Sequence, residues 1–426
     1  MAFFLVASFV LLAPGLSRGD SPSVSTATPE GRLAVFDDVW QTVNDRYYDK
    51  NFHGVDWWAQ RARFRDQAAA ARDQVELYSV LRSLVTSLKD AHTRVFAPEE
   101  KFDWQRPRFI TVGISLREIE GRLTVVNVER GSDAERAGIR AGDLLESIDG
   151  EPAINRLETR LRAQPDSSTP QAARLFALSS LMNGPSGSTV NIDWKDSQER
   201  LHETALTRRW YQRTPGLRIG YKNNIAVISI DAFTHAIALD FARNFSSQPT
   251  RLQKARGIVI DLRGNGGGDA QAMAEIVAAF LPPATALGQF TDRHGYVSLK
   301  IDTGAGPFYS ARINRSLNAP IIILASERTS SAAEIFISSL QKTNRAVVLG
   351  THTCGCVLAV RMHHALPDGG ELAISEMDFR TADGERLEGE GIQPDTTVNQ
   401  TRQMIYAGRD QVLEVAVSRL RRNAHH

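Results

Sequence analysis

Residues 321–360 read IIILASERTSSAAEIFISSLQKTNRAVVLGTHTCGCVLAV, and this stretch decides the fold of the C-terminal half. An apolar run leads into a serine pair, then into a helical pattern and then into a second apolar run, so the predicted order is strand, helix, strand. Ser331 stands where the first strand meets the helix. Backbone N–H groups and the positive end of a helix dipole can stabilise negative charge at such a junction. The junction therefore offers what a nucleophile and an oxyanion site both require.

Ser331 also has a simpler interpretation, as the cap of the helix. Ser331 to Glu334 is an S-x-x-E capping box in front of an apolar run. On spacing alone, capping is the commoner role of a serine at a helix start. The two roles are compatible, so the rest of the chain has to decide whether Ser331 attacks a carbonyl.

The composition is that of a globular protein with several domains. The chain has 426 residues, too many for one core and enough for two or three domains. Its 50 basic and 49 acidic residues nearly cancel, which argues against nucleic acid or an anionic membrane surface as the main partner. The sequence contains no zinc-type ligand spacing and no P-loop, so we expect neither a metal nor another cofactor.

The N-terminus has the pattern of an export signal. Residues 2–13 form an apolar run too short to span a bilayer comfortably, and small residues follow near Gly19, where a signal peptidase would cut. We expect a signal peptide over 1–19, a linker over 20–30, and an exported protein, periplasmic or secreted and of bacterial type, with no membrane span once the signal is removed. Because no Lys or Arg precedes the run, an uncleaved anchor is the alternative.

The two cysteines, Cys354 and Cys356, are one residue apart. A disulfide between them would close a very small ring that we expect to be strained. Two cysteines alone also supply too few ligands for a structural metal site. The sequence therefore predicts two free thiols.

Residues 31–107 are predicted to form an N-terminal helical region. Apolar residues recur there at spacings of three and four, which places them on one face of a helix. The first such face consists of Leu33, Phe36, Val39, Trp40, Val43 and Tyr47. Asp90 and His92 are the residues of this region with possible chemistry, although a lone histidine at the end of a helix is usually structural.

Residues 108–209 change to short strands with glycine-rich turns. The segment GSDAERAGIRAGDLLESIDGEP resembles the core of a PDZ domain, with that family's pattern intact from Ala137 to Gly150. A PDZ domain takes a peptide C-terminus as an added strand and holds its carboxylate with loop amides. By this resemblance the carboxylate-binding loop consists of Val112, Gly113, Ile114 and Ser115. A PDZ domain that serves only as a scaffold is the alternative.

Residues 210–405 alternate between apolar strands and helices, which predicts an α/β layer with buried central strands, and residues 406–426 follow as a C-terminal helix or tail. The order of motifs over nearly the whole mature chain resembles peptidase family S41, the C-terminal processing or tail-specific serine proteases. The motifs that carry this resemblance are FDDVWQTVNDRYYDKNFHGVDW, LKDAHTRV, the PDZ segment, DLRGNGGG, ERTSSAAEI, GTHTCGC and LEGEGIQPD. The resemblance implies a multidomain α/β protein with a ClpP/crotonase-like core, and a serine endopeptidase acting on unfolded or C-terminally recognised proteins.

The resemblance also assigns roles to residues. Ser331 becomes the nucleophile, and the backbone amides of Gly267 and Ala332 become the oxyanion donors. The tail-specific branch activates its serine with a lysine in the run Thr-Phe-Gly-Lys-Gly, but Cys356 occupies that position here. The branch typified by the tricorn protease instead uses a histidine and a glutamate, which His92 and Glu388 match.

Several alternatives stay open at this point. Asp90 competes with Glu388 as the group that orients His92, and Cys356 and Lys342 are weaker candidates for the base. The alternative function is a catalytically impaired, PDZ-containing peptide-binding protein, with a small-ligand carrier as a minor third possibility. The oligomeric state is not predictable from this sequence.

Overall fold

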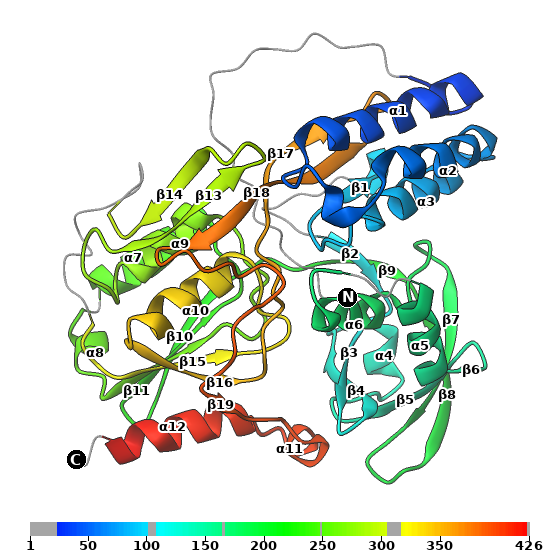
Figure 1. Ribbon diagram of the computed structural model, residues 1–426. Coiled ribbons are helices and arrows are strands. Elements are labelled where there is room, and N and C mark those ends of the chain that lie inside the picture. Colours follow the sequence, from blue (N-terminus) through cyan, green and yellow to red (C-terminus); the bar gives the residue numbers. More distant parts are fainter. Residues whose placement is uncertain (1–23, 101–107, 164–166, 248, 305–316, 424–426) are drawn as a thin grey trace.

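The computed structural model describes residues 24–100, 108–163, 167–247, 249–304 and 317–423 (Figure 1). The predicted signal peptide and the start of the predicted linker lie outside these residues. Helix α1 (Pro29–Arg46) includes the last two residues of the predicted linker, because the Thr28 side chain caps it and proline is favourable in a first helical turn. No helix of the described residues is long and apolar enough to cross a membrane.

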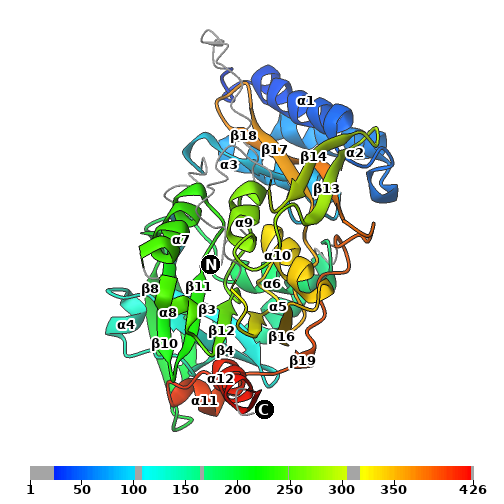
Figure 2. The ribbon, with the colours of Figure 1, turned by 90° about the vertical axis from the view of Figure 1, so that its left-hand side faces the viewer.

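The N-terminal region is a helical layer joined to the rest of the chain by a strand. Helices α1, α2 (Trp57–Ala70) and α3 (Gln74–Thr86) lie side by side at one end of the molecule (Figures 1 and 2). Their buried faces pack together with Leu372 of the C-terminal half. The chain then enters strand β1 (Arg94–Phe96), which brings the preceding segment with Asp90 and His92 against the second sheet of the core.

The middle of the chain contains a second, separate core built on an antiparallel sheet with strand order β3-β4-β5-β7-β8. These strands are β3 (Ile114–Ile119), β4 (Arg122–Val128), β5 (Leu144–Ile148), β7 (Thr189–Lys195) and β8 (Leu201–Thr207), with β6 (Glu151–Pro152) paired to β5. The helices are α4 (Asp133–Arg136), α5 (Ala153–Ala163) and α6 (Pro170–Ser180). A two-stranded ribbon of β2 (Arg108–Thr111) and β9 (Arg209–Gln212) joins this unit to its neighbours. Strand β3 is an edge strand of the sheet and lies next to α6.

The C-terminal half is built on a six-stranded sheet of order β10-β11-β12-β15-β16-β19, parallel except for the β10–β11 pair. The strands are β10 (Leu217–Lys222), β11 (Ile225–Ile230), β12 (Gly257–Asp261), β15 (Ile321–Ala325), β16 (Ala346–Gly350) and β19 (Thr396–Thr397). Ile323 faces one side with α7 (His235–Ser247), α9 (Ala270–Val277) and α10 (Ala332–Lys342), whereas Ile322 and Leu324 face α12 (Gln411–Asn423) on the other. Helices cover both faces (Figure 2), so successive residues of the central strands are apolar, as in the run IIILA of β15.

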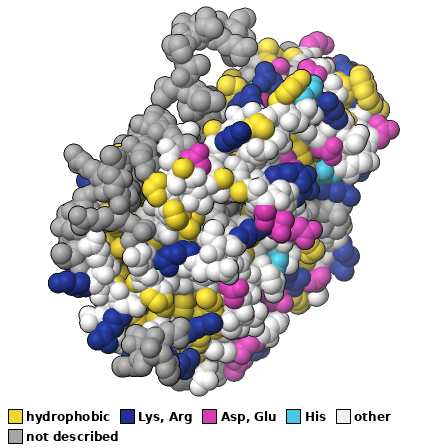
Figure 3. Space-filling view, turned by 60° about the vertical axis from the view of Figure 1, so that its left-hand side comes forward, with side chains coloured by type: hydrophobic (Ala, Val, Ile, Leu, Met, Phe, Trp, Pro, Cys, Tyr) yellow, Lys and Arg dark blue, Asp and Glu magenta, His cyan; other side chains and the backbone are white. Residues whose placement is uncertain are grey.

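A second sheet of order β1-β18-β13-β14 joins the helical layer to the core. Its strands after β1 are β13 (Ala286–Asp292), β14 (Val297–Asp302) and β18 (Glu371–Thr381), and β17 (Ala359–Ala365) also pairs with β18. The sequence LAISEMDFRTADG, predicted to be a hairpin, is mostly the single strand β18, because that strand has partners in β17, β13 and β1. Basic and acidic side chains are both scattered over the face drawn in Figure 3.

Candidate active site

Ser331 occupies a strained backbone position between β15 and α10. Its φ of 58° and ψ of −127° lie in a region that residues with a Cβ rarely adopt. Such conformations cost about 1–3 kcal/mol and persist only where the surroundings enforce them, which is why they cluster at functional sites. A sharp strand-to-helix turn with a strained serine is also how other hydrolases present a nucleophile. The Ser331 side chain is nearly buried, with 3% of the residue exposed.

Neighbouring backbone groups hold Ser331 in this conformation. Its N–H donates to the carbonyl of Cys356 at 2.8 Å and to Glu334 Oε2 at 3.1 Å, so the Glu334 arm of the predicted capping box is confirmed. Gly267 packs directly against the serine, since a Cβ added at Gly267 would lie 2.6 Å from Ser331 Cβ. The glycine run is therefore required for close approach of two backbones.

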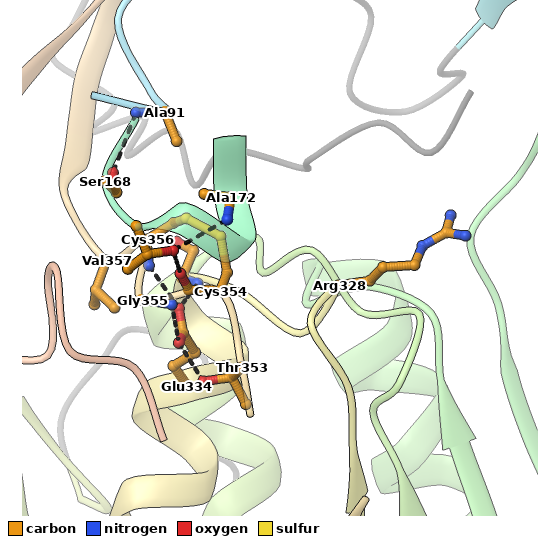
Figure 4. The surroundings of a disulfide bond; sticks show 12 residues. Ala91, Ser168, Ala172, Arg328, Glu334, Thr353, Cys354, Gly355, Cys356 and Val357 are labelled. Carbon is orange, nitrogen blue, oxygen red and sulfur yellow. Dashed lines mark hydrogen bonds between the residues drawn. A yellow bond between two sulfur atoms is a disulfide. The ribbon is translucent and has the colours of Figure 1, made fainter. Parts of the chain in front are cut away.

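Glu334 is completely buried and does much more than cap the helix. Besides the Ser331 amide, its carboxylate accepts hydrogen bonds from Thr353 Oγ1, from the Gly355 amide at 2.7 Å and from the Cys356 amide at 3.0 Å (Figure 4). Burial raises the pKa of Glu334 to about 7, while these donors lower it. Sequence reasoning missed this role, because the S-x-x-E spacing reveals the cap and nothing about the loop after β16.

Cys354 and Cys356 form a disulfide, so the prediction of two free thiols is wrong. Gly355 between them has a φ of 69°, which folds the chain back and leaves the two Cα atoms 5.2 Å apart, within the usual range for a disulfide. The bridge packs against Ala91 and Ala172. A disulfide sulfur carries no thiolate, so Cys356 is neither a base nor a second nucleophile in this structure.

The two predicted oxyanion donors differ in their present partners. The Gly267 amide donates to the side chain of Asn265 at 2.8 Å. Ala332 is the first residue of α10, where an amide has no acceptor within the helix, and no acceptor elsewhere in the described chain takes its N–H. The Ala332 amide and the helix dipole thus point at the space beside Ser331 without competition.

His92 lies in the segment between α3 and β1 and is buried, with 2% of the residue exposed. Burial lowers the pKa of His92 to about 4, so the ring is neutral at pH 7. Asp90 accepts hydrogen bonds from the backbone amides of His92 at 2.6 Å and Thr93 at 2.8 Å, and therefore fixes the turn and not the ring. The ring atom Nδ1 is buried and has no hydrogen-bond partner among the described residues.

Glu388 lies in the segment that follows β18 and, like His92, has a buried polar atom without a partner among the described residues. Its Oε2 accepts the amides of Val357 and Leu358, whereas its buried Oε1 has no partner in the part of the chain that the structure describes. Burial raises the pKa of Glu388 to about 8, and the charge of Asp90 also raises it, while the nearby Ser168 side chain and the amides of Val357 and Leu358 lower it.

The side chains of Ser331, His92 and Glu388 are not hydrogen-bonded to one another among the described residues. No hydrogen bond links His92 to Ser331 or to Glu388 within the described residues. The disulfide loop connects the two sides, because Cys356 accepts the Ser331 amide while the bridge packs against Ala91, the neighbour of His92. Figure 4 shows Ala91 and Ser168 on one side of this loop and Glu334 on the other.

Comparison with known proteins agrees with this architecture. Residues 224–398 match the model of peptidase family S41, residues 29–86 match the tricorn protease C1 domain, and residues 124–168 match the PDZ domain. Residues 224–398 therefore form a peptidase family S41 domain. The predicted multidomain α/β fold, with N-terminal helices, a PDZ domain and a peptidase core, is thereby confirmed.

Relatives of this S41 chain are processing proteases. A carboxyl-terminal-processing protease of Synechocystis is 25% identical over 417 residues, covering 93% of this chain and 88% of the relative. That of Picosynechococcus is 28% identical over 374 residues, covering 85% and 82%. The chain is accordingly a serine-type peptidase.

Solved structures share the fold. The photosystem II D1 C-terminal processing protease has a TM-score of 0.55 at 21% identity and covers 86% of this chain and 93% of its own. Mature CPAF has a TM-score of 0.69 at 16% identity, with coverage of 93% and 98%.

Lys342, a weaker candidate for the catalytic base, has acidic partners on the surface. This lysine pairs with Asp383 at 2.6 Å and with Glu385 at 2.5 Å on the surface of α10. A helix position that faces water agrees with the low expectation for Lys342 as a base.

The PDZ unit of the S41 chain has an open groove. Val112, Ile114 and Ser115 line a pocket between the start of β3 and the end of α6. Gly113 makes the bend before β3 with a φ of 89°, and its amide donates to Thr111 Oγ1 at 3.3 Å.

Proposed function

We propose that this S41 peptidase is an endopeptidase that cuts unfolded or C-terminally recognised proteins through an acyl-enzyme on Ser331. The observation that carries the proposal is the strained backbone of Ser331, enforced by Glu334, Cys356 and Gly267. A cap alone does not require such a conformation, since the other capped helices of the described chain begin from extended residues such as Thr28 and Asp73.

In the proposed reaction, Ser331 Oγ attacks the scissile carbonyl carbon while His92 accepts the hydroxyl proton. The amides of Ala332 and Gly267 stabilise the resulting oxyanion, for which the Gly267 amide must leave Asn265. The tetrahedral intermediate collapses as His92 passes its proton to the leaving amine. A water molecule then repeats the sequence on the ester, and Ser331 is regenerated.

The partnerless polar atoms support Glu388 as the group that orients His92. Buried polar atoms normally have partners, and each exception asks for an explanation. His92 Nδ1 can donate a proton in the neutral ring, and Glu388 Oε1 can accept one. We infer that substrate binding moves the two segments so that this hydrogen bond forms and the opposite ring nitrogen reaches Ser331.

The PDZ groove is the proposed site where substrate is recruited. Edge strand β3 has an unpaired side to which an extended peptide can add, and the pocket beside it is ready to take an apolar side chain. The named relatives process carboxyl termini, and we extend that chemistry to this chain.

Export is proposed on two grounds, the N-terminal apolar run and the disulfide. Disulfides persist mainly in oxidising compartments, and the Cys354–Cys356 bridge is close to the nucleophile. A periplasmic or secreted location follows for the mature enzyme.

A peptide-binding protein without catalysis is the second candidate. It is favoured by the lack of a hydrogen bond between His92 and Ser331 among the described residues, and by the disulfide at the family's lysine position. In that case the PDZ groove would keep its function and Ser331 would only cap α10.

The decisive experiment compares Ser331→Ala with Ser330→Ala, using a quenched fluorescent unfolded casein as substrate. Ser330 is the adjacent buried serine, and its hydroxyl has no hydrogen-bond partner in the described chain, so its removal is a matched control. We expect Ser331→Ala to lower turnover by about a thousandfold or more, and Ser330→Ala to retain most of it. Equal turnover of wild type and Ser331→Ala would leave only the binding protein.

A further inference from the structure

Arg328 belongs to the peptidase core but lines the groove of the PDZ unit. It follows β15, and its backbone amide donates to Ser326 Oγ at 3.1 Å. Its side chain contributes to the pocket formed by the start of β3 and the end of α6. Figure 4 shows this side chain leading away from Glu334 and the disulfide. Only Thr329 and Ser330 separate Arg328 from Ser331 in the sequence.

The guanidinium of Arg328 has no direct ion-pair partner in the described chain, although the charge of the neighbouring Glu327 favours its protonated form. No hydrogen bond or ion pair reaches it from the described residues, and the adjacent Glu327 is already paired with Arg117 at 2.7 Å. Burial lowers the pKa of Arg328 to about 10, which still leaves it protonated at neutral pH. A partly buried cation without a partner is costly, so an anion entering the pocket gains a strong interaction.

The rest of the pocket specifies what kind of anion fits. Ile114, Leu175, Leu178 and Met182 give it an apolar wall. A peptide that adds antiparallel to β3 finishes at the start of that strand, where the pocket and Arg328 lie. The complementary ligand therefore has an apolar last side chain and a terminal carboxylate.

We propose that Arg328 binds the terminal carboxylate of a peptide docked on β3. The inference deepens the proposed function, because it rests on the groove as the recruitment site. It means that the peptidase core itself contacts the recognised chain end, through the same connection that carries Ser331. The PDZ fold alone would then bind carboxyl termini weakly.

Direct binding measurements test this on the full chain carrying Ser331→Ala, which prevents cleavage. The probe is a fluorescein-labelled peptide, Gly-Ser-Gly-Ser-Ala-Leu-Val, with either a free carboxylate or a terminal amide, and the readout is fluorescence anisotropy. We expect Arg328→Gln to weaken binding of the free acid by about tenfold or more, and binding of the amide by less than about twofold. Arg328→Lys should recover part of the loss.

The matched control is Arg122→Gln, which removes an exposed arginine of β4 that pairs with Glu146. It should leave both affinities unchanged. Equal affinity of Arg328→Gln and the parent for the free acid would overturn the proposal, and so would an equal loss for acid and amide, which indicates a structural role. If the parent binds neither peptide, the carboxylate site is wrong, whereas the Ser331 and Ser330 comparison on casein still decides the peptidase activity separately.

Discussion

The nucleophile region and the base region of this peptidase differ in how completely they are fixed. Around Ser331, the serine amide and the buried carboxylate of Glu334 have partners, and Gly267 packs directly against the serine. The Ala332 amide and the Ser330 hydroxyl are left there without a partner in the described chain. Around His92, a ring nitrogen of the histidine and an oxygen of Glu388 are buried without partners in the described chain. Both regions are buried, so exposure does not explain the contrast.

The difference indicates that folding completes one half of the site and leaves the other half to a later step. The strain at Ser331 is offset by local hydrogen bonds, and therefore exists before substrate arrives. The unpaired atoms at His92 and Glu388 cost free energy that a conformational change can recover. Preorganised donors with a mobile base are consistent with a peptidase that is held inactive until its groove is occupied.

Replacing His92 by Ala gives the largest expected effect. The proposed base is lost while the groove is untouched, so turnover of casein should fall by about a hundredfold to ten-thousandfold. The affinity of the Ser331→Ala protein for a carboxyl-terminal peptide should be the same with and without His92→Ala.

The control for His92 is His294→Ala, a change at an exposed histidine in the turn between β13 and β14. Near-normal turnover of His92→Ala would remove the base region from the mechanism and make the comparison irrelevant to catalysis. A parallel loss in His294→Ala would point to a general effect of histidine removal.

Replacing Glu334 by Gln tests how strongly the nucleophile region around Ser331 is fixed. A Gln side chain offers one acceptor oxygen in place of two, and its NH₂ group faces donors that need an acceptor, among them the amides of Ser331 and Cys356. We expect the free energy of unfolding to fall by roughly 3–5 kcal/mol, measured by urea denaturation in the Ser331→Ala background, where self-cleavage cannot interfere. Glu203→Gln, on the exposed face of β8, is the matched control and should change it little.

The nucleophile half was predictable from the sequence, and the contrast between the halves was not. The order of apolar runs around Ser331 predicts the strand-to-helix junction, and S-x-x-E predicts the Ser331–Glu334 contact. The hydrogen bonds between Glu334 and residues 353–356 form only because a loop distant in the sequence meets α10. The disulfide depends on the positive φ of Gly355. Neither can be inferred from spacing, because both are consequences of tertiary packing.

The pH dependence of stability tests whether Glu388, in the base region, is buried without a partner for its Oε1. Its pKa of about 8 in the folded protein exceeds the ordinary 4.5, so the folded state keeps a proton that the unfolded state releases. The resulting stabilisation is complete below pH 4.5 and is lost as the pH rises toward 8. Glu388→Gln stays neutral, so its free energy of unfolding relative to the parent should increase across that window. Other titrating groups are common to both proteins and cancel. A difference that is constant with pH would mean that Glu388 is ionised throughout, with its Oε1 already satisfied.

Lys342→Ala gives the smallest expected effect and separates the core site from its surroundings. The ion pairs of Lys342 with Asp383 and Glu385 are near the surface, where such pairs contribute about 0–1 kcal/mol. Turnover of casein should stay within about twofold of wild type, and the free energy of unfolding should change by less than about 1 kcal/mol. A large loss of turnover with unchanged stability would contradict both the pairing seen here and His92 as the base, because it would show that this lysine leaves its acidic partners and reaches Ser331.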